Sequence, residues 1–358
     1  METGEISDLT MKDLQDYSLL SHNTFGIEAK CRHYLEYTDI KEAQQVAAIL
    51  RDSDLPYMII GGGSNLLLTQ DYDGIVVRSA IKGITFSLFT SFPTHGRLPV
   101  AFPYTLKCGS GEVWDDVVAY CVDHQLYGAE NLSLIPGDVG ASAVQNIGAY
   151  GVEVKELITE VEVVEIATGH IRVFQNEECG YAYRDSRFKH EWKNRYLITH
   201  VTYQLQQTFE PRLDYGNIRT ELERKGIIKP TAQQLRQVII DIRNAKLPDP
   251  IIMGNAGSFF MNPIVPKEKY EQLASQYEGM PHYTVDADHE KIPAGWMIDQ
   301  CGWKGKSMGR AGVHDKQALV LVNRGGATGQ EIVALCEAIQ RDVKEKFGIA
   351  IYPEVNII

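Results

Sequence analysis

The chain has 358 residues, of which 44% are apolar and 23% are charged, and its formal net charge is −12. A chain of this length exceeds what one hydrophobic core usually supports, so we expect two or three domains. The acidic balance argues against a nucleic-acid-binding protein, which needs a basic face. It does not exclude an anionic small substrate in a locally basic pocket.

Cysteine usage and the N-terminal residues indicate a cytoplasmic protein. The six cysteines are scattered and form no C-x-x-C pair, which argues against a zinc ribbon or a thioredoxin-like site and fits a reducing compartment. The N-terminal stretch METGEISDLTMKDLQDYS is acidic and lacks an apolar core, so it does not resemble a signal peptide. No run of about 18 apolar residues is present, so we predict no membrane span. The scattered cysteines give no metal-ligand spacing, and we predict no metal site.

The first elements expected along the chain are a helix, a strand and a glycine loop. Asp39 with Glu42 is a capping-box variant, and the apolar residues that follow recur at helical spacing. The segment YMII, residues 57–60, predicts a buried strand that runs directly into GGGSN, residues 61–65. A second amphipathic helix is expected around residues 114–121.

A second glycine-rich segment, LIPGDVGASAVQNIGAYG, occupies residues 134–151. It is too apolar for a linker, and its density of small residues suggests a backbone that packs closely against something flat or bulky. A tightly packed core turn is the simpler interpretation. We favour a ligand site, because glycine at this density has few purely structural uses.

The second half of the chain is predicted to mix strands and helices. Alternating apolar residues predict antiparallel strands in ITEVEVVEIA, HIRVFQ and YLITHVTYQL. Thr231 with Gln234 predicts a helix through Ile242, and NAKLPDP breaks it at an expected domain boundary. Thr328 with Glu331 opens a last helix that stops at Gly348, and a short strand over residues 349–358 ends the chain. The pattern is mixed α+β.

The first glycine loop does not fit a nicotinamide-type Rossmann domain. Gly61 and Gly63 match G-x-G-x-x-G, but Leu66 stands at the third glycine position and no acidic residue occurs near position 83. A loop whose backbone N–H groups form an anion nest for a pyrophosphate remains possible.

Motifs that occur in one order from about residue 20 to the end carry a specific resemblance. They are NTFG (23–26), IIGGGSNLLL (59–68), residues 130–153, GYAYRDSRFKH (180–190), KLPDP with GNAGSFFMNP, AGWMIDQ with GVHDKQALVLVN, and the terminal PEV. The set resembles the UDP-N-acetylenolpyruvoylglucosamine reductase family, in its longer type, because DYGNIRTEL carries Tyr215 in the loop that such members close over the substrate. Residues 1 to about 18 and a longer hairpin over residues 93–104 depart from the family pattern.

The resemblance implies an α+β fold: a two-subdomain FAD-binding fold of the vanillyl-alcohol oxidase type plus a C-terminal α+β substrate-binding domain. The expected parts are residues 1–88, 89–245 and 246–348, with the strand 349–358 returning to the FAD-binding part. It also implies non-covalent FAD and NADPH as co-substrate. The implied reaction reduces the enolpyruvyl ether of UDP-N-acetylglucosamine enolpyruvate to UDP-N-acetylmuramate for peptidoglycan, in a monomer with no nucleic-acid or membrane partner.

Three residues match the catalytic positions of that family. Arg184 corresponds to the carboxylate clamp, although the residues alone do not distinguish it from Arg187, and its planar fork suits a carboxylate. Ser258 corresponds to the proton donor, whereas taken alone it reads as the cap of a tight turn. Glu354, which on position alone reads as a terminal surface acid, corresponds to the residue that orients Ser258 or a water. The strand after Glu354 is expected to pair into the core and hold it beside Ser258.

The resemblance also assigns substrate and cofactor contacts. Lys246, Tyr215, Asn262 and Gln317 match the residues that bind the sugar nucleotide, with Lys246 as a point charge for phosphate. The backbone of the first loop should hold the pyrophosphate and the second segment the isoalloxazine and ribityl chain. The FAD contacts are then Gly61, Gly62, Gly63, Ser64, Asn65, Pro136, Gly137, Gly140, Ala141, Ser142, Asn146, Gly148, Ala149 and Tyr150.

Two other functions compete with this interpretation. One is another FAD-dependent sugar or alcohol oxidoreductase of the same fold, which shares the glycine loops but has no use for Lys246, Tyr215 and the terminal glutamate together. The other is a flavin- or nucleotide-binding protein without catalysis. NADPH oxidation that depends on the enolpyruvyl sugar nucleotide would exclude both.

Overall fold

The computed structural model describes residues 11–88 and 104–358, so most of the longer hairpin expected over residues 93–104 lies outside the described residues. The described chain forms two compact units. Unit 1 comprises residues up to 17, residues 31–62 and residues 73–243; unit 2 comprises residues 18–30, 63–72 and 244–358. The boundary therefore falls inside the first glycine loop, between Gly62 and Gly63. The three-part division expected from the sequence stays a prediction.

A four-stranded sheet begins unit 1, with the order β1-β2-β5-β3. β3 and β5 run parallel, with Tyr57 opposite Ile75. The strands are β1 (Lys12–Ser18), β2 (Lys30–Tyr37), β3 (Tyr57–Ile60) and β5 (Tyr72–Ser79).

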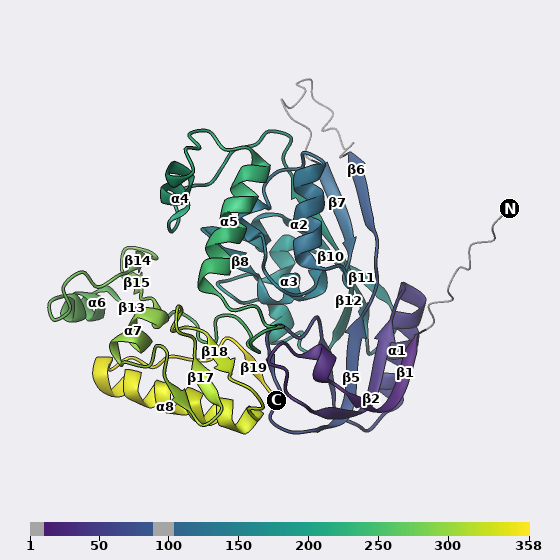
Figure 1. Cartoon of the computed structure of the whole chain (residues 1–358). Coiled ribbons are helices and arrows are strands. Elements are labelled where there is room, and N and C mark those ends of the chain that lie inside the picture. The colour runs from purple at the N-terminus through teal and green to yellow at the C-terminus, as the bar shows by residue number, and fades with distance from the viewer. Residues whose placement is uncertain (1–10, 89–103) are drawn as a thin grey trace. The chain divides into compact units, whose positions relative to one another are not determined.

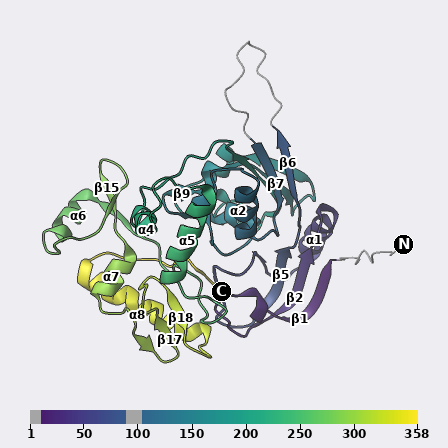
Figure 2. The ribbon, with the colours of Figure 1, turned by 45° about the horizontal axis from the view of Figure 1, so that its top comes forward.

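Helix α1 (Ile40–Asp52) lies against this sheet (Figure 2). The Asp39 side chain accepts a hydrogen bond of 2.8 Å from the backbone N–H of Glu42, which confirms the expected N-cap. The buried face of α1 packs with Leu35 and Val77 of the first sheet and with Val164 of the next sheet. The buried face of this helix therefore contacts both the first sheet and the second sheet of unit 1.

The second sheet of unit 1 is antiparallel throughout and has the order β11-β10-β12-β7-β6. Helices α2 and α3 cover one face of it (Figure 1), where Trp114 is fully buried and stacks edge-on against Tyr203. The elements are β6 (Ile84–Leu88), β7 (Tyr104–Gly109), β10 (Ile158–Glu165), β11 (Ile171–Gln175), β12 (Tyr196–Leu205), α2 (Trp114–Asp123) and α3 (Val139–Gln145).

Two further helices, α4 (Ile218–Arg224) and α5 (Ala232–Lys246), form a smaller apolar cluster of their own. Two short strands, β8 (Gly148–Ala149) and β9 (Val152–Glu153), pair within the second glycine segment and just after it.

Unit 2 is built around the long helix α8 (Gly329–Phe347), which is buried along one face. Thr328 and Glu331 form the expected capping box, and Gly348 ends the helix at φ 66°. Around it lie α6 (Lys267–Ala274), α7 (Ala294–Gln300), β13 (Ile264–Pro266), β14 (Tyr283–Thr284), β15 (His289–Lys291), β16 (Ser307–Met308), β17 (Ala311–Val313), β18 (Leu321–Asn323), β4 (Leu66–Leu67) and β19 (Asn356–Ile357).

The structure confirms the α+β class, corrects two element boundaries and adds one helix. α5 continues to Lys246 rather than ending at Ile242, because Asn244 to Lys246 can remain helical and Pro248 is the first strong breaker. The second glycine segment contains α3, which small residues allow to pack tightly. The terminal strand is shorter than expected and covers only Asn356–Ile357; before it, Pro353 forms an isolated antiparallel bridge with Phe260.

All six cysteines are free thiols. Among the residues that the structure describes, no helix has the length and apolar character needed to cross a bilayer.

Candidate active site

The two glycine-rich segments lie side by side in unit 1. A Cβ atom on Gly61 would stand 3.0 Å from the Cβ of Ala141, and one on Gly62 would stand 3.1 Å from Oδ1 of Asp138. A larger residue at either position would push the segments apart. The glycines therefore allow close contact between protein segments, in addition to any approach by a ligand.

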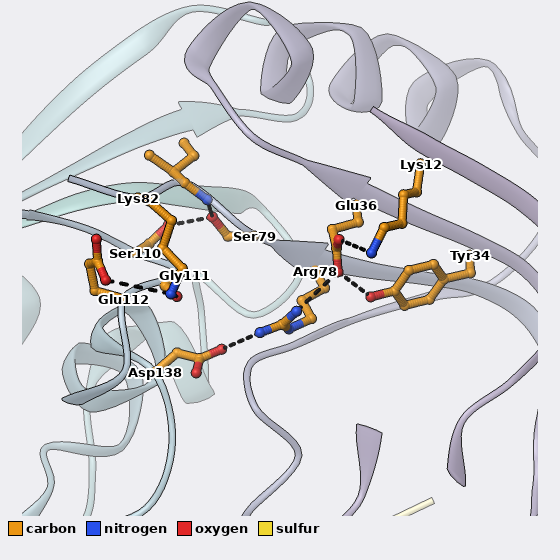
Figure 3. A network of polar contacts seen from close by, with 11 residues as sticks. Lys12, Tyr34, Glu36, Arg78, Ser79, Lys82, Ser110, Gly111, Glu112 and Asp138 are labelled. Atoms are coloured by element: carbon orange, nitrogen blue, oxygen red, sulfur yellow. Dashed lines mark hydrogen bonds and ion pairs between the residues drawn. The ribbon is translucent and has the colours of Figure 1, made fainter. Parts of the chain in front are cut away.

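A buried cluster of charges holds the second segment to the first sheet (Figure 3). Arg78 on β5 donates to Asp138 at 3.3 Å and to Glu36 on β2 at 3.0 Å. Glu36 also accepts from the Tyr34 hydroxyl at 2.7 Å and pairs with Lys12 at 2.6 Å. Two carboxylates thus face two cations, and this pairing lets Glu36 and Asp138 remain buried, while Lys12 is exposed.

The pKa values in this cluster follow from burial and pairing. Burial raises the pKa of Asp138 above its ordinary value, although Arg78 acts in the opposite direction. Burial also disfavours the charged form of Glu36, but hydrogen bonds from Lys12, Tyr34 and Arg78 outweigh it and lower its pKa.

Arg184 reaches back to the second glycine segment. Its guanidinium donates to the carbonyl of Gly148 and, at 3.4 Å, to the carbonyl of Asn146. A Cβ on Gly148 would lie 2.7 Å from Nη1 of Arg184 and 2.9 Å from the backbone carbonyl oxygen of Val152, and the backbone contact favours glycine there. Arg184 itself has φ 55°, a left-handed conformation that costs a non-glycine residue about 1–3 kcal/mol and is typical of functional sites.

The loop that carries Tyr215 also contacts the second glycine segment. A Cβ on Gly151, whose φ is 78°, would be 3.3 Å from the Cβ of Tyr215. The side-chain amide of Asn131 donates to the carbonyls of Tyr150, at 2.9 Å, and Arg212, at 3.0 Å, and so ties the segment and the loop together.

Two of the predicted FAD contacts use their side chains within the protein. The hydroxyl of Ser142 donates to the carbonyl of Val139 at 2.6 Å, and the amide of Asn146 donates to the carbonyl of Ala182 at 2.7 Å. Asn146 also caps α3 in a left-handed conformation at φ 46°. Contacts from these two residues to a flavin would therefore come from the main chain.

Arg243 is a candidate site residue that the sequence interpretation missed. Its Nε is buried and has no hydrogen-bond partner within residues 11–88 and 104–358. Burial lowers the pKa of Arg243, and the charge of Arg184 lowers it further, against the opposite effects of Tyr150 and Asp115. A buried N–H normally has an acceptor, so this one fits a carbonyl or anionic group of a bound ligand such as the flavin. Arg243 follows the buried Ile239 by four residues, so the sequence places it on the same face of α5. This spacing was the signal that could have identified it.

Ser258 lies in a turn that two buried aromatic residues follow. The backbone N–H of Gly257 donates to Oδ1 of Asn255 at 2.9 Å, and Gly257 has φ 66°, which glycine adopts without strain. Phe259 and Phe260 are 0% and 1% exposed, while Ser258 is half-buried. The sequence therefore places a partly exposed hydroxyl at the edge of an apolar core.

Glu354 lies beside the segment that carries Ser258. Its backbone N–H donates to the carbonyl of Phe259 at 2.8 Å, and Met261 donates to the carbonyl of Tyr352 at 3.0 Å. The terminal strand β19 pairs in parallel with β4, with Asn356 opposite Leu66. The expected pairing of the C-terminal strand is confirmed, but Asn356, Ile357 and Ile358 are exposed and do not enter the core.

The remaining predicted residues of unit 2 gather mostly at the start of α7. Oδ1 of Asn262 accepts from the N–H of Ala294 at 2.9 Å, and Oε1 of Gln317 would be 3.0 Å from a Cβ on Gly295. Lys246 is exposed at the end of α5.

The predicted residues are divided between the two units. Unit 1 carries Gly61, Gly62, the second glycine segment with Pro136 to Tyr150, Arg184 and Tyr215; unit 2 carries Gly63, Ser64, Asn65, Lys246, Ser258, Asn262, Gln317 and Glu354.

Comparison with known proteins identifies both parts of the chain. Residues 32–175 match the model of an FAD binding domain, and residues 249–358 match the model of the C-terminal domain of UDP-N-acetylenolpyruvoylglucosamine reductase. The crystal structure of UDP-N-acetylenolpyruvylglucosamine reductase from Thermus caldophilus is similar in fold, with a TM-score of 0.65 at 21% identity over 97% of this chain and 99% of that one.

Curated relatives match over nearly the full length. A UDP-N-acetylenolpyruvoylglucosamine reductase of Bacteroides fragilis is 53% identical over 96% of this chain and 99% of its own length. One of Porphyromonas gingivalis is 47% identical over 96% of this chain and 98% of its own. With its FAD binding domain and its full-length relatives, the chain is an oxidoreductase that belongs to the UDP-N-acetylenolpyruvoylglucosamine reductase family.

Proposed function

We propose that this protein reduces the enolpyruvyl ether of UDP-N-acetylglucosamine enolpyruvate to UDP-N-acetylmuramate, with electrons from NADPH. Bound FAD supplies hydride transfer to the terminal vinyl carbon of the substrate. The observation that carries the proposal is the placement of Glu354, whose N–H bonds the carbonyl of Phe259 at 2.8 Å, next to Ser258, in a chain of this family. Non-covalent FAD, a monomeric state and a cytoplasmic location belong to the same proposal.

The reaction builds negative charge on the substrate. When hydride reaches the terminal carbon, charge develops on the other vinyl carbon and spreads onto the attached carboxylate. Arg184 binds that carboxylate with its planar fork and stabilises the charge. Its guanidinium is already oriented by the carbonyls of Asn146 and Gly148.

Ser258 then donates its proton to the carbanionic carbon. A serine hydroxyl is a weak acid in water, but a carbanion is a strong base and the buried Phe259 and Phe260 limit access of water. Glu354 orients Ser258 or a water for this transfer. Lys246, Tyr215, Asn262 and Gln317 bind the diphosphate and uridine.

The two glycine-rich segments fit FAD; most of their predicted contacts belong to unit 1, and Gly63 to Asn65 belong to unit 2. The first glycine loop follows the carboxyl end of a parallel strand, the second lies against it, and the buried Nε of Arg243 needs an acceptor. We assign the pyrophosphate to residues 61–65 and the isoalloxazine and ribityl chain to residues 136–150.

The test is an NADPH oxidation assay on the purified flavoprotein, with and without the enolpyruvyl sugar nucleotide. We expect oxidation that depends on this acceptor and a product heavier than the substrate by two hydrogens. Oxidation of sugars or alcohols with no reduction of the sugar nucleotide would instead indicate another oxidoreductase of this fold. Flavin binding without either activity would indicate a binding protein.

A further inference from the structure

The last residue of the first glycine loop, Asn65, contacts the C-terminal segment. Its side-chain amide donates to the carbonyl of Glu354 at 3.2 Å. Its own carbonyl accepts from the backbone N–H of Asn356 at 3.1 Å and from the side-chain amide of Asn356, also at 3.1 Å. Asn65 and the terminal segment belong to the same unit, so these contacts are internal to unit 2.

Both main-chain groups of Glu354 are therefore held by site segments. The N–H bonds the carbonyl of Phe259, the residue after Ser258, at 2.8 Å, and the carbonyl accepts from Asn65. Two bonds on opposite sides of one residue restrict rotation of its backbone, and the direction of the Glu354 side chain follows from that backbone.

The loop that carries Asn65 is itself fixed to the segment of Ser258. A Cβ on Gly63 would lie 1.9 Å from the carbonyl oxygen of His22, so only glycine permits this approach. Thr24 donates its N–H to the carbonyl of Gly63 at 3.2 Å and its hydroxyl to the carbonyl of Asn255 at 2.6 Å. The NTFG motif thus bridges the glycine loop and the turn that precedes Ser258.

These contacts close a ring from Asn65 through Glu354, Phe259, Asn255 and Thr24 back to the loop. We propose that Asn65 is a positioning residue: it sets the side chain of Glu354 relative to Ser258, so that the pyrophosphate loop also orders the proton-transfer pair. This inference rests on the proposed function, because it needs Glu354 to act in the substrate half-reaction.

The experiment compares Asn65→Ala with Thr69→Ala in the full-length flavoprotein. Thr69 is the matched control, because its hydroxyl donates to the carbonyl of Ile358 at 2.7 Å and anchors the same terminal segment away from Glu354. At saturating FAD, we expect Asn65→Ala to slow reoxidation by substrate about tenfold to a hundredfold, as small misplacements of a catalytic group do. Flavin reduction by NADPH should remain near the wild-type rate, and Thr69→Ala should leave both rates nearly unchanged.

A double-mutant cycle with Glu354→Gln shows whether Asn65 acts through Glu354. We expect Asn65→Ala to add less than about twofold to the loss caused by Glu354→Gln alone. If the two losses multiply, or if Asn65→Ala weakens only FAD binding, the positioning role is wrong while the proposed function stands. A wild-type reoxidation rate in Glu354→Gln would overturn the role of Glu354 and the positioning role with it.

Two milder variants keep the test informative if Asn65→Ala does not fold. Asn65→Asp keeps the shape but replaces the donor with an acceptor opposite the Glu354 carbonyl, and it should behave like Asn65→Ala. Asn65→Ser keeps a donor on a shorter side chain and should show a smaller defect. A serine variant slower than the aspartate variant would contradict the proposal.

Discussion

At the residue scale, Ser258 is the centre of the proposed chemistry. Gly257 makes the turn in which Ser258 lies, and the side chains of Phe259 and Phe260, which follow Ser258, are buried. We expect Ser258→Ala to leave flavin reduction by NADPH nearly intact and to slow reoxidation by substrate by several orders of magnitude, since the hydroxyl serves only the second half-reaction. Stopped-flow absorbance of the flavin measures both steps, and equal slowing of the two would count against the assignment.

Lys246 tests the substrate site separately from the chemistry. It is exposed at the end of α5, where a point charge can meet a phosphate. A charged hydrogen bond contributes about 1.5–3 kcal/mol, so Lys246→Ala should raise KM about tenfold to a hundredfold with a smaller change in kcat. Lys229→Ala, at another exposed lysine, is the control. An unchanged KM in Lys246→Ala would remove Lys246 from the site.

At the element scale, the terminal strand β19 is short but tied down. It pairs with β4, and the carbonyl of Ile358 accepts from the N–H of Thr69 at 2.8 Å. Deleting residues 356–358 should lower turnover sharply, because Glu354 loses its anchor. FAD should still bind, because most of the predicted FAD contacts lie in unit 1, which the deletion leaves unchanged. Steady-state kinetics with a flavin titration checks this. Full-length turnover in the truncated protein would show that the strand does not hold Glu354.

The second sheet contains a pH-dependent contact between neighbouring strands. Glu162 on β10 bonds His200 at 2.8 Å and Lys107 at 2.9 Å. These contacts lower the pKa of Glu162 to about 2, and the bond to His200 has the largest effect. Because the folded pKa lies below the ordinary value, the stabilisation is fully present above about pH 4.5 and is lost as pH falls towards about 2.

Replacement of Glu162 should reveal this dependence. We expect Glu162→Gln to reduce the free energy of unfolding by about 1–3 kcal/mol at pH 7. The difference in free energy of unfolding between Glu162→Gln and the wild type, measured by urea unfolding, should narrow below about pH 4.5. Glu160→Gln on the same strand is the control, since that carboxylate accepts only a 3.3 Å contact from Gln175. A gap that widens on acidification would contradict the sign of the effect.

At the scale of the whole molecule, cofactor binding should be visible as stability. A ligand that binds only the folded state at 100 times its Kd stabilises it by about 2.7 kcal/mol. We expect FAD to raise the free energy of unfolding of the apoprotein by this amount. FMN at the same concentration should do much less, because it lacks the diphosphate link and adenosine that the first glycine loop is assigned to hold. Equal effects of FMN and FAD would contradict that assignment.

Much of the fold could be predicted because its signals are local. The Asp39 cap, the Thr328 and Glu331 box and the Gly348 stop each act within a few residues, and the structure has all three. The extent of α5 and the presence of α3 were missed, because tertiary packing decides where a marginal helix continues.

The class, the main helices and strands and, through the order of its motifs, the family follow from the order of amino acids along the chain. Which of these motifs touch depends on tertiary contacts. The pairing of Asn65 with Glu354, of Arg78 with Asp138 and of Arg184 with Gly148 joins residues far apart in the chain. The isolated Nε of Arg243 depends on its three-dimensional surroundings. Local propensity carries no information about such contacts, because their geometry is fixed by segments that are distant in the sequence and meet only in the folded chain.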